Sequence, residues 1–230
     1  PWSDPFEDVH VCATTKVLND HIKNDPTFKD RYLEQELKLR DEMRSNPGSG
    51  FSSIGIAVIK VYFHVVVTPS DQSSITNAVL QEQITALNAD FRKTHGNTPA
   101  RWSSVAADTY IEFTWDTSDI NRVNTTGDFD ADNSMKFSSM GGSDAYQPTK
   151  YLNIWICPVA NNVLGYAQFP GGPASTDGVV VVPSSLKNSP TSQSPYNLGR
   201  TLTHEVGHWL NLIHIWGDGD CNVDDLLADT

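Results

Sequence analysis

An almost unbroken run of apolar residues, most of them β-branched or aromatic, extends over Ala57–Val67. A continuous run of this kind is typical of a strand that is buried on both faces of an α/β sheet. His64 lies inside the run, and we interpret it as a hydrogen-bonded structural residue rather than a metal ligand. Residues 110–116 and 151–157 predict a second and a third strand.

A helical period replaces the strand pattern in residues 76–93. Apolar side chains recur there at spacings of four, three and four residues, namely Leu80, Ile84, Leu87 and Phe91. This spacing predicts one long amphipathic helix that backs the sheet and takes no part in the chemistry.

Residues 1–50 differ from the rest of the chain because they carry seven Lys and Arg against ten Asp and Glu. Two helices are predicted here, one over residues 14–21 and one that begins at Asp25 as its N-cap with proline at the first helical position. The sequence Asn-Pro-Gly-Ser-Gly at residues 46–50 predicts a flexible linker. We therefore expect a charged helical arm that is loosely attached to a larger domain over residues 51–230.

A short strand that Pro170 terminates is predicted near the middle of the chain, and a second apolar run follows it at residues 178–183. Such a strand suits a sheet edge, where unpaired backbone groups can bind an extended peptide. A surface hairpin is the alternative. We interpret five residues as the substrate edge strand: Gly165, Tyr166, Ala167, Gln168 and Phe169.

Length and charge limit the possible functions. The 230 residues suit one sizeable domain plus a short extra segment. The net charge of −12 argues against nucleic acid and anionic membrane surfaces as partners. The sequence contains no apolar run of membrane-spanning length and no signal peptide at Pro1, so we expect that any export signal has been removed or was never cloned.

The strongest chemical signal is His-Glu-Val-Gly-His-Trp-Leu-Asn-Leu-Ile-His at residues 204–214. On a helix, His204 and His208 lie one turn apart on one face and can bind the same zinc ion, while Glu205 lies beside it as a general base. His214 follows six residues later and reaches the ion only if the helix ends and the chain turns back.

The stretch matches HExxHxxGxxH, the metzincin signature, with Asn211 in place of the usual glycine. Asparagine also tolerates the positive φ that a helix-ending turn needs, so we expect a helix over residues 197–210 that ends there. Three unrelated histidines on an amphipathic helix are the alternative, and the spacing makes that coincidence improbable.

The chain resembles the pappalysins, a branch of the metzincins, over most of its length. The matching segments are residues 62–66, 87–92, 152–155, 165–170 and 199–216. The resemblance implies a secreted zinc endopeptidase that acts on proteins or peptides. It also implies an α/β fold with a mixed five-stranded twisted sheet, a backing helix, an active-site helix and a preceding helical pro-segment. His204, His208 and His214 would bind Zn²⁺, and Glu205 would be the base.

The family pattern also includes a Met-turn and a tyrosine after the third histidine, and residues 215–230 contain neither. We expect either that these residues belong to a longer or cleaved chain, whose C-terminal subdomain is mostly missing here, or that this subdomain is absent. The resemblance further implies that Cys221 pairs with a cysteine beyond residue 230.

Cys12 is the cysteine that is left over if Cys157 is buried in its strand and Cys221 pairs elsewhere. A thiolate held on zinc by a pro-segment can displace the catalytic water, and pappalysin pro-segments can carry such a cysteine. We therefore expect residues 1–50 to be an intramolecular inhibitor with Cys12 as fourth zinc ligand. A disulfide or an inert thiol are the alternatives. Activation would need a cut at one of three places: Arg40, Arg44 or the linker.

Two acidic stretches raise the question of calcium. Residues 128–132 resemble the start of an EF-hand loop but lack its glycine and its final glutamate, which favours a solvated loop. A second loop carries four carboxylates that could bind Ca²⁺ near the third histidine, with a solvated loop as the alternative. These are Asp218, Asp220, Asp224 and Asp225.

Two other functions stay open on the sequence alone. A catalytically inactive metzincin-fold module would bind peptides or a partner without cleaving them; the intact Glu205 argues against it, and the missing Met-turn argues for it. An aminopeptidase of another zincin type would use a distant glutamate as its third ligand, which His214 makes unnecessary.

Overall fold

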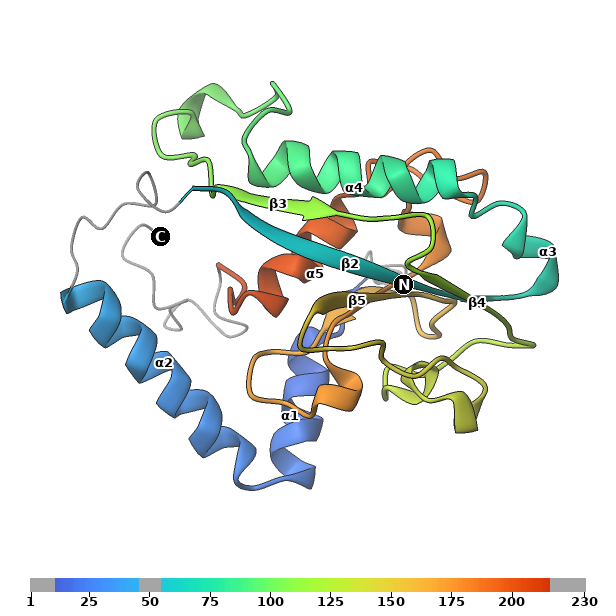
Figure 1. The fold of residues 1–230 in the computed structure, drawn as a ribbon, viewed down its shortest axis with the longest axis horizontal. Helices are drawn as coiled ribbons and strands as arrows, with labels where there is room; N and C mark the ends of the chain where they lie inside the picture. The colour runs from blue at the N-terminus through green and yellow to red at the C-terminus, as the bar shows by residue number, and fades with distance from the viewer. Residues whose placement is uncertain (1–10, 46–54, 216–230) are drawn as a thin grey trace, which may run out of the picture.

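The computed structural model describes residues 11–45 and 55–215 and is built around one twisted mixed sheet (Figure 1). The strand order is β1-β6-β7-β5-β2-β3, and β4 also pairs with β2. The strands are β1 (Val11–Cys12), β2 (Ala57–Val67), β3 (Ile111–Thr114), β4 (Ile120–Asn124), β5 (Tyr151–Ile156), β6 (Val163–Ala167) and β7 (Val179–Val181). The helices are α1 (Thr14–Asn24), α2 (Phe28–Ser45), α3 (Pro69–Gln72), α4 (Asn77–Phe91) and α5 (Arg200–Trp209).

The long strand β2 explains how the predicted five-stranded sheet comes to contain seven strands. Its first half pairs with β3 and its second half with β4, so these two short strands share one position beside it. The positions β6, β7, β5, β2 and β3/β4 are the five that were predicted, and β1 of the N-terminal arm adds a sixth. Strand β4 was not predicted from the sequence. Its residues are exposed or only half-buried, so they form no apolar run.

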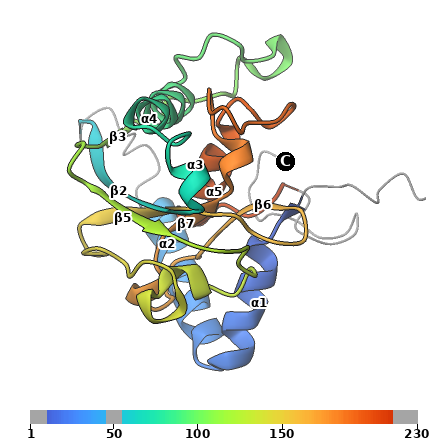
Figure 2. The same cartoon turned by 90° about the vertical axis from the view of Figure 1, so that its right-hand side faces the viewer.

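Helices cover the two faces of the sheet separately (Figure 2). On one face α4 and α5 pack over a large apolar core that includes Val65, Leu80 and Val206. On the other face lies a smaller core, which includes Val17 of α1 and Val66 of β2 among its buried residues. Val65 and Val67 belong to the large core and Val66 to the smaller one, and residues 63–67 are all buried, so this half of β2 is buried on both faces as predicted. The first half is not, because Ala57, Val58 and Lys60 are exposed. Among the described residues, every helix is too short or too polar to cross a membrane.

His64 has the structural role that its place in the strand predicted. Its Nδ1 atom lies 2.7 Å from Ser143 Oγ, its Nε2 atom lies 2.8 Å from Asn153 Oδ1, and its ring stacks on Trp155. Burial lowers the pKa of His64 to about 4, so the ring is neutral at physiological pH.

The N-terminal arm is attached more firmly than its composition suggested. Ala13 and Val17 are buried in the smaller core, and the ring centroid of Tyr32 on α2 lies 5.8 Å from that of Phe169. The second helix begins at Phe28 rather than at Pro26, because the Asp25 carboxylate accepts hydrogen bonds from the Thr27 backbone N–H and hydroxyl and closes a turn first. The predicted linker at residues 46–50 lies outside the described residues.

Lys136 is a fully buried lysine that no sequence pattern singled out. Its Nζ atom donates a hydrogen bond to Thr176 O at 2.7 Å and lies 5.0 Å from the Trp155 ring centroid. Burial lowers the pKa of Lys136 to about 7, although the Asp177 carboxylate opposes part of this change.

We expect the substitution Lys136→Met to flatten the pH dependence of stability. The unfolded lysine keeps its proton up to about pH 10.4, so the unfolded state binds more protons than the folded state between pH 7 and that value. The contribution of Lys136 to stability therefore rises with pH in this window, by at most about 1.4 kcal/mol per pH unit.

Urea unfolding of both proteins at pH 7, 8, 9 and 10 tests this expectation. The free energy of unfolding of the variant, relative to wild type, should fall as pH rises. The exposed Lys150 supplies the control substitution Lys150→Met, which should leave the pH dependence unchanged. A constant difference between the Lys136→Met variant and wild type would contradict the assignment.

Candidate metal centre

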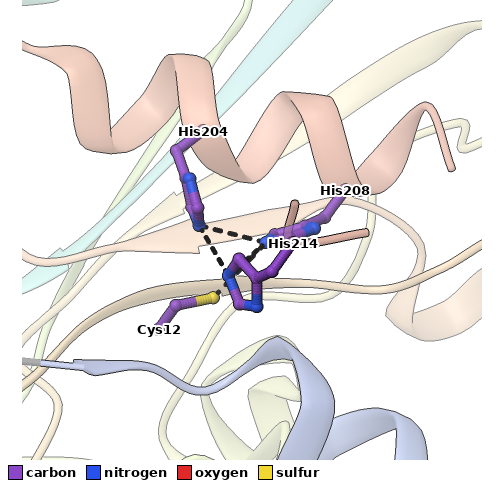
Figure 3. Close-up of side chains that lie close together, drawn as sticks. All are labelled: Cys12, His204, His208 and His214. Atoms are coloured by element: carbon purple, nitrogen blue, oxygen red, sulfur yellow. Dashed lines mark hydrogen bonds between the residues drawn. The ribbon is translucent and has the colours of Figure 1, made fainter. Parts of the chain in front are cut away.

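Helix α5 presents two of the three predicted ligands, and the turn after it presents the third. The Nε2 atoms of His204 and His208 lie 3.0 Å apart, and His214 Nε2 lies 3.2 Å from each of them. Figure 3 shows the three rings pointing toward one another. The structure thus brings together all three histidines of the predicted ligand set.

The helix ends where the sequence predicted, because Asn211 adopts the left-handed conformation with φ of 79°. The turn also orients a ligand. His208 Nδ1 lies 2.6 Å from Leu212 O, and a carbonyl only accepts hydrogen bonds, so this nitrogen carries the proton. His208 Nε2 is therefore the nitrogen with the lone pair, and it points into the centre. At the other end α5 begins at Arg200, three residues later than predicted, after Gly199 with φ of 77°.

Cys12 completes the group from the N-terminal arm. Its sulfur lies 3.6 Å from His208 Nε2, and the four ligand atoms of Cys12 and the three histidines all lie within 4.8 Å of one another. Tetrahedral zinc, with bonds of about 2.0–2.3 Å, places its ligand atoms roughly 3.3–3.7 Å apart. Three imidazole nitrogens and one sulfur at these distances fit zinc.

Glu205 lies beside this group without belonging to it. The side chain is 1% exposed, and Oε2 accepts hydrogen bonds from Thr14 Oγ1 at 3.0 Å and from Cys12 Sγ at 3.7 Å. Burial raises the pKa of Glu205 to about 8. Gly165 allows the close approach of β6, because a Cβ atom there would lie 3.0 Å from Glu205 Oε1 and 2.7 Å from Val180 O.

The predicted edge strand lies next to the centre, and the arm covers it. Strand β1 pairs in parallel with β6, with Cys12 opposite Gly165. Ala13 N–H donates to Gly165 O at 3.0 Å. Without the arm, β6 would be the edge of the sheet.

The five residues of the predicted edge strand differ in where they point. Tyr166 is buried in the smaller core, where its hydroxyl donates to Met135 Sδ. Gln168 follows the strand, and its side chain bonds within the next loop. Phe169 also follows the strand, and its ring centroid lies 5.7 Å from that of His208. Two of the five residues hydrogen-bond to the arm through their backbone, Gly165 with its C=O and Ala167 with its N–H.

Sequence reasoning missed Thr14, which contacts both Glu205 and the edge strand. Its Oγ1 atom accepts a hydrogen bond from Ala167 N–H at 2.9 Å. No strand signal in the sequence points to this role, because Ala13 has φ of −99° and ψ of 10° and Thr14 opens α1, so the two-residue period of a strand does not run from Cys12 to Thr14.

The calcium predictions fall into two groups. The four aspartates from Asp218 to Asp225, like Cys221, lie outside the described residues. Residues 128–132 are described, and there Asp132 Oδ1 accepts from Ser134 N–H at 2.9 Å. Between residues 11 and 215, leaving out 46–54, the histidine and Cys12 group is the sole cluster of three or more potential metal-binding side chains.

Comparison with known proteins shows that the chain is similar to metalloproteases. Residues 136–230 match the family model Peptidase_M43, described as pregnancy-associated plasma protein-A. A promirolysin variant of Tannerella forsythia is 36% identical, with a TM-score of 0.82, over 96% of this chain and 75% of that one. Mature mirolysin of the same organism, in complex with a cleaved peptide, is 39% identical, with a TM-score of 0.71, over 76% of this chain and 72% of that one.

Fungal relatives carry names of the same kind. An extracellular metalloprotease of Colletotrichum graminicola is 30% identical over 89% of this chain and 68% of its own length. An extracellular metalloprotease of Arthroderma gypseum is 30% identical over 84% of this chain. The chain spans 61% of the length of that relative.

Proposed function

Because the chain belongs to the pappalysin (M43) family of metalloproteases, we propose that it is the latent form of an extracellular zinc endopeptidase. Residues 1–50 act as the inhibitory pro-segment, and residues 51–230 belong to the catalytic domain. The observation that carries the proposal is the convergence of one sulfur and three imidazole nitrogens within 4.8 Å, beside a buried glutamate.

His204, His208 and His214 would hold the zinc ion, with Cys12 as the fourth ligand in the latent form. Zinc, when bound, supplies Lewis-acid polarisation of the scissile carbonyl and makes a water molecule more acidic. Burial and the Glu205 carboxylate raise the pKa of Cys12 to about 12, so this thiol needs a nearby cation in order to ionise. The relatives' name, metalloprotease, implies a metal ion, and one thiol with three imidazoles is a ligand set that suits zinc.

Glu205 serves as the general base of the proposed reaction. Its carboxylate takes a proton from the attacking water and delivers it to the leaving amine of the cleaved bond. Strand β6 would hold the peptide substrate in an extended form through the outward backbone groups of Gly165 and Ala167.

Activation requires that the arm leaves β6. The arm continues through α2 to Ser45, and β2 begins at Ala57. A cut between these elements would separate the pro-segment from the sheet, and the candidates remain Arg40, Arg44 and the linker at residues 46–50. N-terminal sequencing of the activated enzyme would identify the site.

An inactive peptide-binding module is the second candidate, and two observations disfavour it. Glu205 is present and lies 3.0 Å from a side chain of the arm that would occupy the substrate site. The related mature mirolysin was determined in complex with a cleaved peptide. A quenched-fluorescence peptide assay on the activated natural chain decides between cleavage and binding alone.

Removal of the metal should abolish peptide cleavage and lower stability together. A metal that binds only the folded state at 100 times its dissociation constant stabilises it by about 2.7 kcal/mol. We therefore expect chelation to lower the unfolding midpoint and to stop cleavage, and stoichiometric zinc to restore both.

The substitution His204→Ala should reproduce the loss of zinc, as measured by elemental analysis. His95 supplies the matched control, because its ring accepts a hydrogen bond from Asn97 N–H, outside the centre. His95→Ala should keep one zinc per chain. Full zinc content in His204→Ala would refute the assigned ligand set.

A further inference from the structure

We propose that Thr14 is a second inhibitory contact of the pro-segment: its hydroxyl occupies the base Glu205 and the Ala167 amide of the substrate strand at the same time. The inference rests on the proposed function for the roles of Glu205 and β6. It adds Thr14 to Cys12 as a residue of the pro-segment that blocks the active site.

The hydroxyl of Thr14 uses its donor and an acceptor position on two different groups. It donates to Glu205 Oε2 at 3.0 Å and accepts from Ala167 N–H at 2.9 Å. Thr14 is 0% exposed and Glu205 is 1% exposed, so water does not compete for these bonds. A hydroxyl can make both contacts because it is at once a donor and an acceptor.

The backbone of the arm sets the position of Thr14. Ala13 N–H donates to Gly165 O and fixes the register between the arm and β6. The Ala13 side chain belongs to the smaller core, whereas the side chains of Cys12 and Thr14, on either side of it in sequence, both reach Glu205. Strand β1 ends at Cys12 and α1 begins at Thr14, so the junction between them at Ala13 delivers a thiol to the histidines and a hydroxyl to the base.

The contacts of the arm on β6 are those that a bound peptide would need. The outward groups of the strand include Gly165 C=O and Ala167 N–H, and the arm satisfies the first with a backbone N–H and the second with the Thr14 hydroxyl. Toward Ala167 the hydroxyl thus takes the place of a substrate carbonyl. Toward Glu205 it takes the place of the water whose proton the base would accept.

A role in starting α1 does not account for these bonds. The N-cap of α1 is Ala13, and no side chain caps the helix. The two hydrogen bonds of the Thr14 hydroxyl described above join it to residues outside α1, namely Ala167 of β6 and Glu205 of α5. Valine has nearly the same shape as threonine and lacks the hydroxyl, so Thr14→Val removes the two bonds and keeps the packing.

Hydrogen exchange of the Ala167 amide in the intact full-length chain tests the contact without any reference to catalysis. Loss of a buried hydrogen-bond partner should accelerate exchange by about tenfold to a hundredfold in Thr14→Val. Thr14→Ser keeps the hydroxyl and should stay near wild type, and Thr15→Val, at the next position, should leave the Ala167 amide unchanged. The measurement is made in zinc-loaded and in chelated protein, so that it does not depend on the metal.

Basal peptide cleavage by the intact zinc-loaded chain is the second readout, with intactness checked by mass spectrometry. We expect Thr14→Val to raise it by about the same factor, whereas turnover after activation should equal that of wild type because the arm has been removed. Wild-type exchange at Ala167 in Thr14→Val, or equal effects of Thr14→Val and Thr14→Ser, would overturn the inference. An activated wild-type chain that cleaves no peptide would instead refute the proposed function.

Discussion

The substitution Glu205→Gln should abolish turnover of the activated enzyme while the zinc content stays at one ion per chain. Glutamine keeps the shape of the side chain, and Glu205 does not belong to the group of ligand atoms that converge on the centre. The amide of the substituted glutamine, however, cannot accept a proton from water. Loss of a positioned general base costs typically about 10²–10⁴ in rate, which sets the expected decrease in kcat/KM.

Elemental analysis and the peptide assay on the same preparation separate the role of Glu205 in proton transfer from one in metal binding. Glu82 on α4 offers a matched control, because its carboxylate is partly exposed and pairs with Lys187 at 3.1 Å, away from the centre. Glu82→Gln should keep both zinc and activity. A Glu205→Gln enzyme that is both zinc-loaded and active would remove Glu205 from its assigned role.

The substitution Cys12→Ala should release activity from the intact chain without any cut in the arm. The Cys12 sulfur lies 3.6 Å from His208 Nε2 and 3.7 Å from Glu205 Oε2, so it blocks the centre and the base together. A contact to a charged group is worth about 1.5–3 kcal/mol, and its loss should raise the open fraction by about tenfold to a hundredfold. The measurement is the initial rate of peptide cleavage before any processed chain appears.

Cys157 provides the thiol control for this experiment. It is fully buried in the smaller core and takes no part in the metal centre. Cys157→Ala should therefore stay latent, although the small cavity that it leaves should lower stability. Equal latency of Cys12→Ala and wild type would show that the thiol is not the inhibitory group.

The sequence predicted the centre well because its spacing is local. Helix geometry alone brings His204 and His208 together, and the identity of Asn211 predicted the left-handed turn that returns His214. All of these inferences lie within eleven residues of chain, from His204 to His214. The same holds for the second half of β2, where the apolar run correctly predicted a buried strand.

Features that depend on distant pairing were harder to predict. Strand β4 carries no apolar alternation of its own and exists because the second half of β2 offers it a partner. The role of Thr14 depends on the register between Ala13 and Gly165, which are 152 positions apart in the chain. No periodic pattern within the arm contains that register.

Burial of an arm side chain in the smaller core should divide the proposed activation into two stages, the cut in the chain and the dissociation of the arm. Val17 is 2% exposed in this core, and full burial of such a side chain is worth about 1.5–3 kcal/mol. The proposed cut after α2 would leave these contacts intact, so the severed arm should remain bound until it dissociates or is degraded. The onset of proteolysis should accordingly lag behind the cut, by an interval that the off-rate of the arm determines.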